Sequence, residues 1–517
     1  MSFSKCYSAQ AVGLRAHIVG VEVDISKGLH SFSIVGLPDK SVEESKDRMS
    51  AAIKNSGFKS PKQKNQKIVF SLTPSHIKKE GSLFDLASAL AYLLAESEIK
   101  FNPAGKLFIG ELSLNGELRP VKGALPLTQK AKTLGFKEVY LPRQNAKEAA
   151  MISGIEVFGC KTLKEIIEHL DVFPPKEGNV VRQKISPTEE TKISAKESAR
   201  EYGFEDVRGQ ETAKRGLEIA AAGGHNALMH GPPGTGKTML ARAFTDILPT
   251  LSFDEALEAT GIHSISGTLK EPLITRPPFR APHHTSSYVS IIGGGTFPKP
   301  GEATLAHRGV LFLDEFPEFE KRVIESLRQP LEEKTVSISR AKGTETFPAN
   351  FILIAAMNPC PCGHKGAKGK ECICTAGDLY RYDRKLSGPI MDRIDIWLSV
   401  AEVDYKKLSD AVPKGTDTSN DIQKRVEKAR KTQEERFKNH SKHIRTNSEM
   451  GAKDLEKYAP LGEKEKVTLN AAATRMSLSP RSYHRIIKLA RTIADLAGAE
   501  NIGEKHLLEA IGYREKK

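Results

Sequence analysis

The feature that most constrains this chain is an eight-residue run near its middle, Gly231-Pro-Pro-Gly-Thr-Gly-Lys237-Thr238. An apolar run of strand length, 227–229, precedes it, and helix-forming residues, 239–248, follow it. Glycines let backbone N–H groups approach phosphate oxygens closely, and the N-terminus of a following helix favours negative charge. Because the flanking strand and helix are correct, a chance glycine-rich turn is the weaker alternative. The pattern predicts a phosphate-binding loop formed by Gly231, Pro232, Pro233, Gly234, Thr235, Gly236, Lys237 and Thr238.

Apolar runs of strand length alternate with helical patterns around this loop, from about residue 201 to residue 399. The candidate buried strands are 226–230, 310–313 and 351–356. This alternation is typical of a parallel sheet covered by helices, and it predicts an α/β core. Beyond residue 402 the pattern is helical, at 421–437, 463–475, 480–496 and 504–514.

Two adjacent carboxylates, Asp314 and Glu315, directly follow the second candidate strand. Asp314 is suited to hold Mg²⁺ together with the Thr238 hydroxyl, and Glu315 to polarise the attacking water as a general base. Such a pair standing alone is a common surface feature. After a phosphate loop in the same α/β unit, it predicts binding and hydrolysis of ATP, with Lys237 reaching the β- and γ-phosphates.

Three further residues are candidates for the same chemistry. Asn358 follows the third candidate strand and is placed to orient the lytic water, although in isolation it would be a turn residue. Arg393 is a candidate arginine finger for a neighbour's γ-phosphate, with a salt bridge to Asp392 or Asp395 as an equal alternative. Arg481, near the start of a C-terminal helix, is a candidate sensor within its own chain, or else an exposed helical arginine.

The part of the chain before the loop has a different organisation. Short β-rich and helical runs alternate over residues 1–170, which indicates a mixed α/β unit. The following stretch contains Pro174, Pro175 and Pro187 among many charged and hydroxyl residues, which is typical of a linker. We therefore predict an N-terminal domain at 1–170, a linker at 171–198, an ATPase core at 199–402 and a helical C-terminal region at 403–517.

The charge balance permits a nucleic acid partner. Lysine and arginine number 78 against 64 aspartate and glutamate, for a formal net charge of +14. The excess is clustered: residues 54–79 hold seven lysines and no acid, and residues 475–491 hold five basic residues and no acid. Lysine and arginine neutralise phosphates, but many basic faces are merely solvated.

Composition excludes several other classes of protein. Apolar residues at 39% and charged residues at 27% describe a globular protein. No apolar run reaches the ~20 residues of a membrane-spanning helix, and the first residues lack the basic and apolar regions of an export signal. Six cysteines in 517 residues are no disulfide framework, so we expect a cytoplasmic protein with no membrane partner.

Four of the six cysteines form two Cys-x-Cys pairs, Cys360 with Cys362 and Cys372 with Cys374. A polar loop rich in glycine and lysine separates the pairs. Four thiolates can close a tetrahedral structural Zn²⁺ site, which would pin a loop that no core could pack. We favour zinc here, with four reduced cysteines as the alternative.

Longer runs of the chain resemble the AAA+ ATPases of the magnesium-chelatase-like clade, and within it the YifB/ComM family, which is associated with DNA branch migration in natural transformation. The resemblance implies a phosphate-loop core with a helical C-terminal lid, ATP and Mg²⁺ as cofactors, sensor-one Asn358, finger Arg393 and sensor-two Arg481. It also implies a ring, a hexamer by expectation, because the finger acts on a neighbour. The runs that carry it include 280–285, 293–295, 300–302, 306–315, 327–332, 356–363, 386–395 and 478–496.

In this clade two hairpins reach into the pore of the ring. The resemblance places the first within 260–294 and the second at 336–347, where Arg340 and Lys342 lie near the expected tip. Basic hairpin tips that face a pore suit the tracking of phosphates along DNA. For either residue alone, an ordinary solvated turn is an equal alternative.

The N-terminal region resembles the Lon-protease-like domain of the ribosomal-protein S5 fold, through residues 81–91 and 110–121. In Lon proteases a serine and a lysine do the chemistry. Here Leu83 holds the nucleophile's place, and Leu125 or Pro126 holds the lysine's place. We therefore expect a non-proteolytic α+β module that contacts DNA or organises the ring through the lysines of 54–79.

Three functions remain open at this point. The first is an ATP-driven motor on single-stranded or branched DNA, acting as a helicase or branch-migration factor. The second is a chelatase-type motor for metal insertion into a porphyrin, although the chelatase ATPase subunit does not carry the N-terminal module. The third is a protein remodeller, suggested by the Lon-like region.

Overall fold

The computed structural model describes residues 3–173, 184–191, 202–295, 298–340, 343–366, 370–402, 417–441 and 444–514. By its internal contacts the chain divides into two compact units. Unit 1 comprises Met1–Ser194 and Ala256–Ile274, and unit 2 comprises Ala195–Glu255 and Thr275–Lys517. Each unit has its own buried apolar core.

Unit 1 contains two main sheets. A four-stranded sheet has the order β1-β2-β4-β3, in which only β3 and β4 pair in parallel. A three-stranded parallel sheet has the order β5-β8-β9, and β6 pairs with β7. The strands are β1 (Phe3–Val12), β2 (Arg15–Lys27), β3 (Ser31–Val35), β4 (Gln66–Thr73), β5 (Lys106–Phe108), β6 (Glu111–Leu112), β7 (Leu118–Arg119), β8 (Glu138–Pro142) and β9 (Glu156–Cys160).

The helices of unit 1 pack against these sheets, and most of α8 belongs with them. Glu148 of α4 accepts hydrogen bonds from the Leu125 N–H and from the Ser264 hydroxyl of α8, and the Gly123 N–H donates to the Ser264 carbonyl (3.3 Å). These bonds attach α8 to α3 and α4. The helices are α1 (Lys40–Asn55), α2 (Asp85–Ala95), α3 (Ala124–Thr133), α4 (Arg143–Ala149), α5 (Leu163–Leu170) and α8 (Phe253–Ser266).

Unit 2 is built around a five-stranded sheet with the order β11-β14-β17-β10-β18. Every neighbouring pair is parallel, so the carboxyl ends of all five strands lie at one edge. The three central strands are apolar and almost fully buried, as in a parallel sheet covered by helices. The strands are β10 (Ala227–His230), β11 (Phe279–Arg280), β14 (Val310–Leu313), β17 (Ile352–Met357) and β18 (Ile396–Ser399).

Helices and two small hairpins connect these strands. One hairpin pairs β12 (Gly293–Gly294) with β13 (Lys299–Pro300), and the other pairs β15 (Thr335–Arg340) with β16 (Gly343–Pro348). The helices are α6 (Glu211–Gly223), α7 (Lys237–Asp246), α9 (Tyr288–Ile292), α10 (Glu302–Leu305), α11 (Lys321–Ser326), α12 (Arg328–Glu333), α13 (Ala376–Asp383) and α14 (Gly388–Met391).

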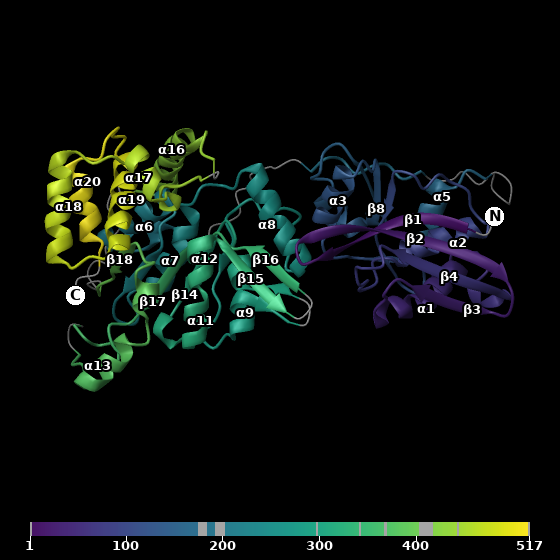
Figure 1. The fold of residues 1–517 in the computed structure, drawn as a ribbon, viewed down its shortest axis with the longest axis horizontal. Coiled ribbons are helices and arrows are strands. Elements are labelled where there is room, and N and C mark those ends of the chain that lie inside the picture. Colours follow the sequence, from purple (N-terminus) through teal and green to yellow (C-terminus); the bar gives the residue numbers. More distant parts are fainter. Residues whose placement is uncertain are drawn as a thin grey trace. The chain divides into compact units, whose positions relative to one another are not determined.

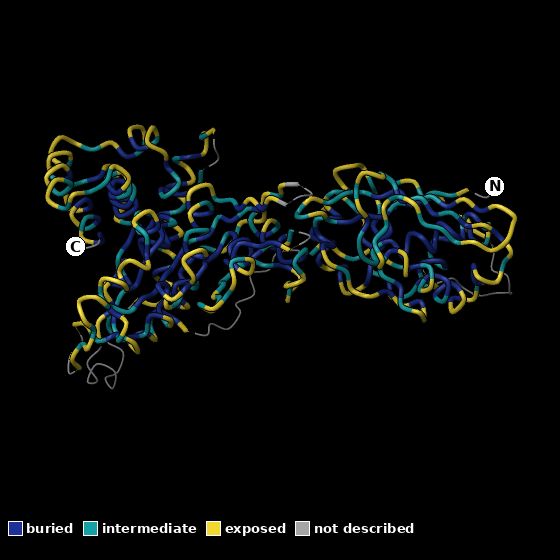
Figure 2. The backbone as a smooth tube through the Cα atoms, turned by 60° about the horizontal axis from the view of Figure 1, so that its bottom comes forward, coloured by how far each residue is buried: buried dark blue, intermediate teal, exposed yellow. Residues whose placement is uncertain are grey.

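The C-terminal helices share the core of unit 2, because side chains such as Leu217 of α6, Ile486 of α19 and Leu507 of α20 belong to one apolar cluster. Figure 1 shows them gathered beside α6 and β18, and Figure 2 shows dark-blue buried residues in the interior with yellow exposed residues on the outer turns. None of the helices among the described residues combines the length and the apolarity that a bilayer crossing requires. These helices are α16 (Ser419–Phe437), α17 (Ala452–Tyr458), α18 (Glu463–Arg475), α19 (Pro480–Leu496) and α20 (Glu504–Gly512).

The expected mixed α/β fold with a parallel sheet and a helical C-terminal region is confirmed. The three strands predicted around the phosphate loop correspond to β10, β14 and β17. The strands that sequence reasoning missed include β1, β7, β8, β9, β11 and β18. Of these, β7 and β11 have two residues each, and β1 mixes polar with apolar residues and depends on pairing with β2 along its whole length.

The predicted linker, 171–198, is described only in part, at 171–173 and 184–191. The second piece, 184–191, is part of unit 1. The Ile185 N–H donates to His169 Nδ1 (3.0 Å), and the Thr188 N–H donates to the Val157 carbonyl (2.7 Å). The division into four segments stays a prediction.

Candidate functional site

The loop between β10 and α7 is the first part of the candidate site. Gly236, its last residue, has a φ of 86°, which residues with a side chain rarely adopt. A Cβ atom at Gly231 would lie 2.0 Å from the carbonyl oxygen of Val400, so glycine is required there as well. These two glycines shape the loop so that its backbone stays close to the start of α7.

Lys237 is the first residue of α7, and its side chain returns to the loop. Its ammonium donates to the carbonyl oxygens of Gly231 (2.7 Å) and Pro232 (2.8 Å), and lies 3.2 Å from Asn358 Oδ1. Burial lowers the pKa of Lys237, and the nearby Asp314 acts in the opposite direction. The buried ammonium of Lys237 therefore donates only to uncharged oxygens. A phosphate oxygen carries negative charge and would be a stronger acceptor than any of them.

Two oxygen donors lie beside this lysine. The Thr238 hydroxyl donates to Asp314 Oδ2 at 2.7 Å, although the two residues are far apart in sequence. A hydroxyl and a carboxylate are the hard oxygen ligands that Mg²⁺ prefers, so this pair fits that ion. Asp314 directly follows β14 and Asn358 directly follows β17, and both strands end at the same edge of the sheet. The structure thus brings Lys237, Thr238, Asp314 and Asn358 together.

Asn358 is held in place by its neighbours. The Tyr382 hydroxyl of α13 donates to its carbonyl (3.1 Å), and the N–H of Gly231 donates to the carbonyl of the preceding Met357 (3.3 Å). The end of β17 is therefore bonded both to the loop and to α13. These bonds anchor the backbone at Asn358, and the contact of Lys237 with Oδ1 holds the side-chain amide.

Glu315 is largely exposed and lies at a sharp turn. Its backbone has a φ of 50°, and its N–H donates to Asp314 Oδ1 (2.9 Å). Its carboxylate Oε2 lies 2.9 Å from Nδ1 of His284. Sequence reasoning gave His284 no role. The missing information was the register of β11 against β14, in which Phe279 pairs with Val310. Five residues further along each chain, the same register sets His284 opposite Glu315.

Arg393 lies at the opposite, amino edge of the sheet. The side-chain amide of Asn226, just before β10, donates to the Arg393 carbonyl (3.1 Å). The phosphate loop begins at the other end of β10, and at ~3.3 Å per residue this strand separates the two ends by roughly 13 Å. The Arg393 side chain is only 3% exposed. The ion pair that the structure gives it is with Glu332, rather than with Asp392 or Asp395.

Arg481 shares the same acidic partner. Its Nη1 lies 3.4 Å from Glu332 Oε1, and its side chain is 62% exposed. The structure therefore brings Arg481 to Arg393 at the amino edge of the sheet. This position does not support a contact between Arg481 and the phosphate loop of its own chain.

The four cysteines of the two Cys-x-Cys pairs meet in space. Their sulfur atoms all lie within 4.8 Å of one another, and Cys360 Sγ is 3.3 Å from Cys362 Sγ and 3.7 Å from Cys372 Sγ. The backbone N–H of His364 is the largest of the contacts that lower the pKa of Cys362 to about 6, which favours one thiolate, whereas the neighbouring thiols raise the pKa of Cys372 and Cys374. Four thiols at this spacing fit a tetrahedral Zn²⁺ ion.

The second predicted hairpin is present as β15 and β16, with Arg340 opposite Gly343 at its tip. Lys342 lies outside the described residues. The region 260–294, expected to hold the first hairpin, contains part of α8, β11, α9 and β12, of which β12 pairs with β13.

The lysine-rich stretch 54–79 is partly neutralised in the fold. Lys62 pairs with Asp47 (2.5 Å), Lys64 contacts Glu96, and Lys79 is buried. A run of like charges in the sequence is therefore not a uniform basic surface. The exposed lysines of this stretch include Lys54, Lys59, Lys62 and Lys67.

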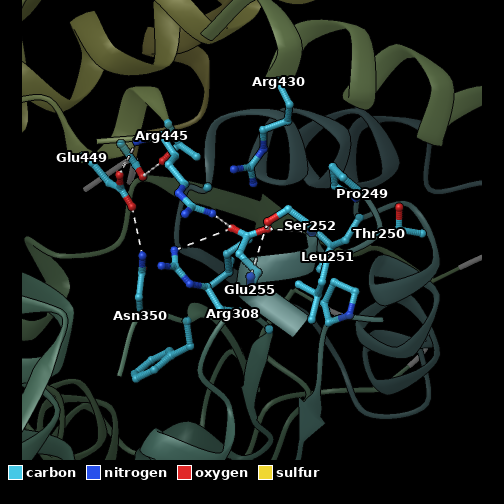
Figure 3. Close-up of a pocket in the computed structure, with 18 of the residues that line it drawn as sticks. Pro249, Thr250, Leu251, Ser252, Glu255, Arg308, Asn350, Arg430, Arg445 and Glu449 are labelled. Atoms are coloured by element: carbon cyan, nitrogen blue, oxygen red, sulfur yellow. Dashed lines mark hydrogen bonds and ion pairs between the residues drawn. The ribbon is translucent and has the colours of Figure 1, made fainter. Parts of the chain in front are cut away.

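A cavity of about 280 Å³ lies at the amino edge of the unit 2 sheet (Figure 3). Glu255 lies between Arg445 and Arg308, with an oxygen 3.7 Å from Arg308. Arg430 donates two hydrogen bonds to the Ala221 carbonyl, at the end of α6. The charged groups that line this cavity thus bond to one another and to the backbone, which is typical of a structural joint.

Sequence models of the magnesium chelatase ChlI subunit match three parts of the chain. The model described as "Magnesium chelatase, subunit ChlI" matches residues 203–408, "Subunit ChlI of Mg-chelatase" matches 21–145, and "Magnesium chelatase, subunit ChlI C-terminal" matches 416–514. The first of these contains the whole candidate site at the carboxyl edge of the sheet, and the third covers the C-terminal helices.

Known proteins resemble the chain over its whole length. It is 39% identical over 519 residues to the competence protein ComM of Haemophilus influenzae, covering 99% of this chain and 98% of that protein. It is 40% identical over 517 residues to the YifB protein of Escherichia coli, covering 99% and 97%. A more distant likeness, 23% over 327 residues, is to the DNA replication licensing factor Mcm6 of Drosophila melanogaster, covering 60% and 36%.

Proposed function

Because this chain belongs to the YifB/ComM family of magnesium-chelatase-like AAA+ proteins, we propose that it is an ATP-hydrolysing motor that acts on DNA. The observation that carries the proposal is the meeting of Lys237, Thr238, Asp314 and Asn358 at the carboxyl edge of a parallel sheet. The relative named a competence protein, 39% identical, supports DNA as the substrate class.

The side chains at this edge divide the work of hydrolysis. Lys237 neutralises the β- and γ-phosphates, and the Thr238 hydroxyl with the Asp314 carboxylate holds Mg²⁺, which supplies further positive charge when bound. Glu315 takes the proton of the attacking water, and Asn358 orients that water. The backbone N–H groups of Gly234–Gly236 and the start of α7 cradle the phosphate oxygens.

Arg393 supports a ring of several copies, which we take to be a hexamer. Its backbone lies at the edge of the sheet opposite the phosphate loop and its guanidinium pairs with Glu332, so a role toward the nucleotide of an adjacent copy is favoured over a role at its own loop. An arginine supplied in this way stabilises the charge of the transferring phosphoryl group. Arg481 was expected to sense the nucleotide of its own chain, but its contact with Glu332 beside Arg393 supports a role toward the same neighbouring nucleotide instead.

The contact with DNA is assigned to the β15–β16 hairpin, with Arg340 and Lys342 as the candidate residues. Basic residues at a hairpin tip neutralise phosphates without reading sequence, which suits a motor that moves along or between strands. The substrate we propose is single-stranded or branched DNA, and the activity is that of a helicase or a branch-migration factor.

The four clustered cysteines are assigned to a structural zinc site. The Zn²⁺ ion would cross-link the segment 360–374, which is rich in polar residues and glycine. Metal analysis of the purified protein should find about one zinc per chain, as expected for a Cys₄ site. A Cys372→Ser variant should lose the metal, whereas Cys160→Ala, which changes a buried thiol elsewhere, should keep it.

Unit 1 is proposed to be a non-proteolytic module for DNA binding or ring assembly. At the expected positions of the Lon catalytic pair, Leu83 is half-buried, Leu125 is buried and the alternative Pro126 is half-buried, and none of them carries a reactive group. The adjacent Ser82 hydroxyl bonds to Glu111. If charge reversal at Lys59, Lys62 and Lys64 leaves DNA affinity and its salt dependence unchanged, the DNA role of this unit is excluded.

ATPase stimulation separates the proposed function from its alternatives. Turnover is to be measured with single-stranded DNA, four-way junctions, porphyrin-chelatase partner subunits and an unfolded protein. Stimulation by a DNA form supports the motor, and the preferred form distinguishes a helicase from a branch-migration factor. Stimulation only by porphyrin partners or by unfolded protein would instead support a chelatase-type motor or a protein remodeller.

The role of Glu315 is tested separately. Glu315→Gln should bind ATP as tightly as the original protein, because the carboxylate is not a phosphate ligand. It should turn over more slowly by about 10²-fold or more, since a positioned general base contributes about that much. Unaltered turnover in this variant would refute the assignment of the base.

A further inference from the structure

The cysteine cluster, formed by Cys360, Cys362, Cys372 and Cys374, lies beside the nucleotide site, and the structural role given to it above does not depend on that position. We propose that the cluster is a redox-sensitive support of the phosphate loop. Oxidation of its thiols to a disulfide releases the metal and weakens ATP binding and turnover, and reduction restores them. This rests on the proposed function, since it takes the phosphate loop as the ATP site and the cluster as a zinc site.

The first turn of the cluster packs on the phosphate loop. Gly363 has a φ of 80°, and a Cβ atom placed on it would lie 2.8 Å from Cδ of Pro233 in that loop. The backbone of Gly363 therefore sits against the Pro233 ring with no room for a side chain. Cys360 holds this turn, because its carbonyl accepts from the Gly363 N–H (3.0 Å) and its Sγ from the Lys365 N–H (3.3 Å). A change at Cys360 Sγ is thus passed to the phosphate loop through a hydrogen-bonded turn.

A charge on the same turn acts on the end of β10. Burial lowers the pKa of His230, the last residue of β10, and the charges of Lys237 and Lys365 act in the same direction. Lys365 therefore lies near the strand end that leads into the phosphate loop. This agrees with the packing of Gly363 on Pro233 and places the cysteine turn beside the loop by a second observation.

The second half of the cluster is connected to Asn358. Cys374 directly precedes Thr375, the residue that caps α13. This helix carries Tyr382, whose hydroxyl donates to the Asn358 carbonyl (3.1 Å). Cys360 follows Asn358 by two residues, so the four sulfur atoms close a ring of chain that begins and ends at Asn358. Loss of the metal opens this ring at its sulfur atoms and releases one of the supports of Asn358.

Cys362 and Cys372 are the pair expected to oxidise. Their Sγ atoms are 3.7 Å apart and both residues are partly exposed, whereas Cys360 is buried. One thiolate attacks hydrogen peroxide and becomes a sulfenic acid with loss of hydroxide, and the other displaces a second hydroxide to form the disulfide. The two sulfurs lose two electrons, and the peroxide takes up these electrons and two protons to become two waters. The Zn²⁺ ion then keeps only two of its four ligands, too few for a closed structural site.

A pair of glycine variants tests the contact with the phosphate loop. Gly363→Ala keeps all four thiols but places a methyl group against Pro233, so KM for ATP should rise by about tenfold while the zinc content stays unchanged. Gly366→Ala is the matched control, since Gly366 lies in the same segment with a φ of 77° and a Cβ atom there would meet nothing within 4 Å. Both variants carry the same backbone strain, so KM for Gly366→Ala should stay within about twofold of the original.

Oxidation of the full chain tests the redox step. Hydrogen peroxide should release zinc to a chromogenic chelator, form a disulfide between Cys362 and Cys372 in peptide mass spectra, and lower ATP turnover by about tenfold over the same time course. A dithiol reductant together with Zn²⁺ should restore the turnover, which separates this change from irreversible oxidation. The double variant Cys6→Ala/Cys160→Ala, which removes the two buried thiols of unit 1, should respond as the original protein does.

The outcomes distinguish this proposal from the proposed function. Equal KM values for Gly363→Ala and Gly366→Ala would overturn the contact with Pro233 as the link. A disulfide with zinc release but unchanged turnover would overturn the redox control, while the zinc assignment would stand. If the purified protein holds no zinc, that assignment fails, and the response of turnover to the disulfide still tests the redox control. If the protein hydrolyses no ATP, the proposed motor fails, and binding of a fluorescent ATP analogue before and after peroxide tests the support of the loop.

Discussion

The two edges of the parallel sheet in unit 2 carry similar residue types, but the charged side chains at the two edges have different partners. At the carboxyl edge, Thr238 and Glu315 are exposed, and the Lys237 ammonium donates to neutral oxygens. At the amino edge, Asp395 is 4% exposed and lies in a buried ion pair with Arg485. Charges at the first edge keep the capacity to bind a ligand, whereas charges at the second already have partners.

This difference teaches which charged groups are available for chemistry. A buried carboxylate that is fully bonded contributes to the fold, and removing its partners is costly. A lysine held only by carbonyl oxygens can exchange them for phosphate, which is the stronger acceptor. Arg393 is the exception, since it is buried at the amino edge and yet assigned to a neighbour's nucleotide.

The largest effect is expected at the carboxyl edge. Lys237→Ala should lose nucleotide binding and reduce ATP turnover by roughly 10³-fold or to background, because the positive charge that faces the β- and γ-phosphates is removed. Binding of a fluorescent ATP analogue and steady-state turnover would check this. The matched control is Lys385→Ala, an exposed lysine of the same unit that pairs with Glu318. Retained turnover in Lys237→Ala would contradict the conclusion that the charges at the carboxyl edge are the ones that bind the nucleotide.

Arg393→Ala tests the exception. Turnover should fall by about 10³-fold, as when an arginine finger is lost, with little change in ATP affinity. When Arg393→Ala and Lys237→Ala chains are mixed, activity should reappear, because a ring then contains intact loops beside intact fingers. If mixed chains stay inactive while each variant still assembles, Arg393 does not act on the nucleotide of an adjacent copy. It would then have a structural role, like the other charged residues of the amino edge.

Asp395→Asn tests the structural role of the amino edge. Asp395 bonds to Arg485 and to the N–H of Asn226 (3.1 Å), and lies 3.5 Å from His225 Nδ1. Breaking a buried ion pair of this kind costs about 3–5 kcal/mol, so denaturant unfolding should shift strongly. A loss of less than about 1 kcal/mol would fall well short of the cost of a broken buried pair, and would contradict the structural assignment.

The same carboxylate sets an expectation for pH. Burial raises the pKa of Asp395, but Arg485 and His225 outweigh burial and hold it well below its usual range. A depressed native pKa stabilises the fold above the unfolded value of about 4 and loses that contribution as pH falls below it. Asp395→Asn should therefore flatten the loss of stability measured on acidification below pH ~4.

The smallest effect is expected at the cavity of the amino edge. Burial raises the pKa of Glu255, but the N–H of Ser252 together with Arg445 and Arg308 lowers it overall. Glu255→Gln should cost about 1 kcal/mol in thermal or denaturant unfolding and leave ATP turnover unchanged. Glu463→Gln, in an exposed pair with Lys466, is the control and should leave the free energy of unfolding nearly unchanged. A loss of turnover in Glu255→Gln would give this cavity a role in function.

Sequence reasoning worked best where a function depends on consecutive residues. The phosphate loop was predictable because a strand, a glycine-rich turn and a helix start lie within one short run. Asp314 and Asn358 were predictable because each directly follows an apolar strand. The four cysteines were predictable as a cluster because their two pairs flank one loop.

It worked less well where a partner comes from another element. The contact of His284 with Glu315 depends on the register of β11 against β14, and β11 is too short to be recognised in the sequence. The pairing of Arg393 and Arg481 with Glu332 depends on where α12 returns to the sheet. The lysines of 54–79 stand without acids in the sequence, yet Lys62 meets Asp47 in space.

The sequence by itself determined the fold class and the family, and it proposed the residues that handle a nucleotide, because these depend on local patterns of glycine, apolar and acidic residues. Only the tertiary structure decided which charges face each other. The order of the strands placed Arg393 at the edge opposite Lys237 and His284 beside Glu315. A side chain's partner is set by the packing of whole elements, and that packing depends on contacts between residues far apart in the chain.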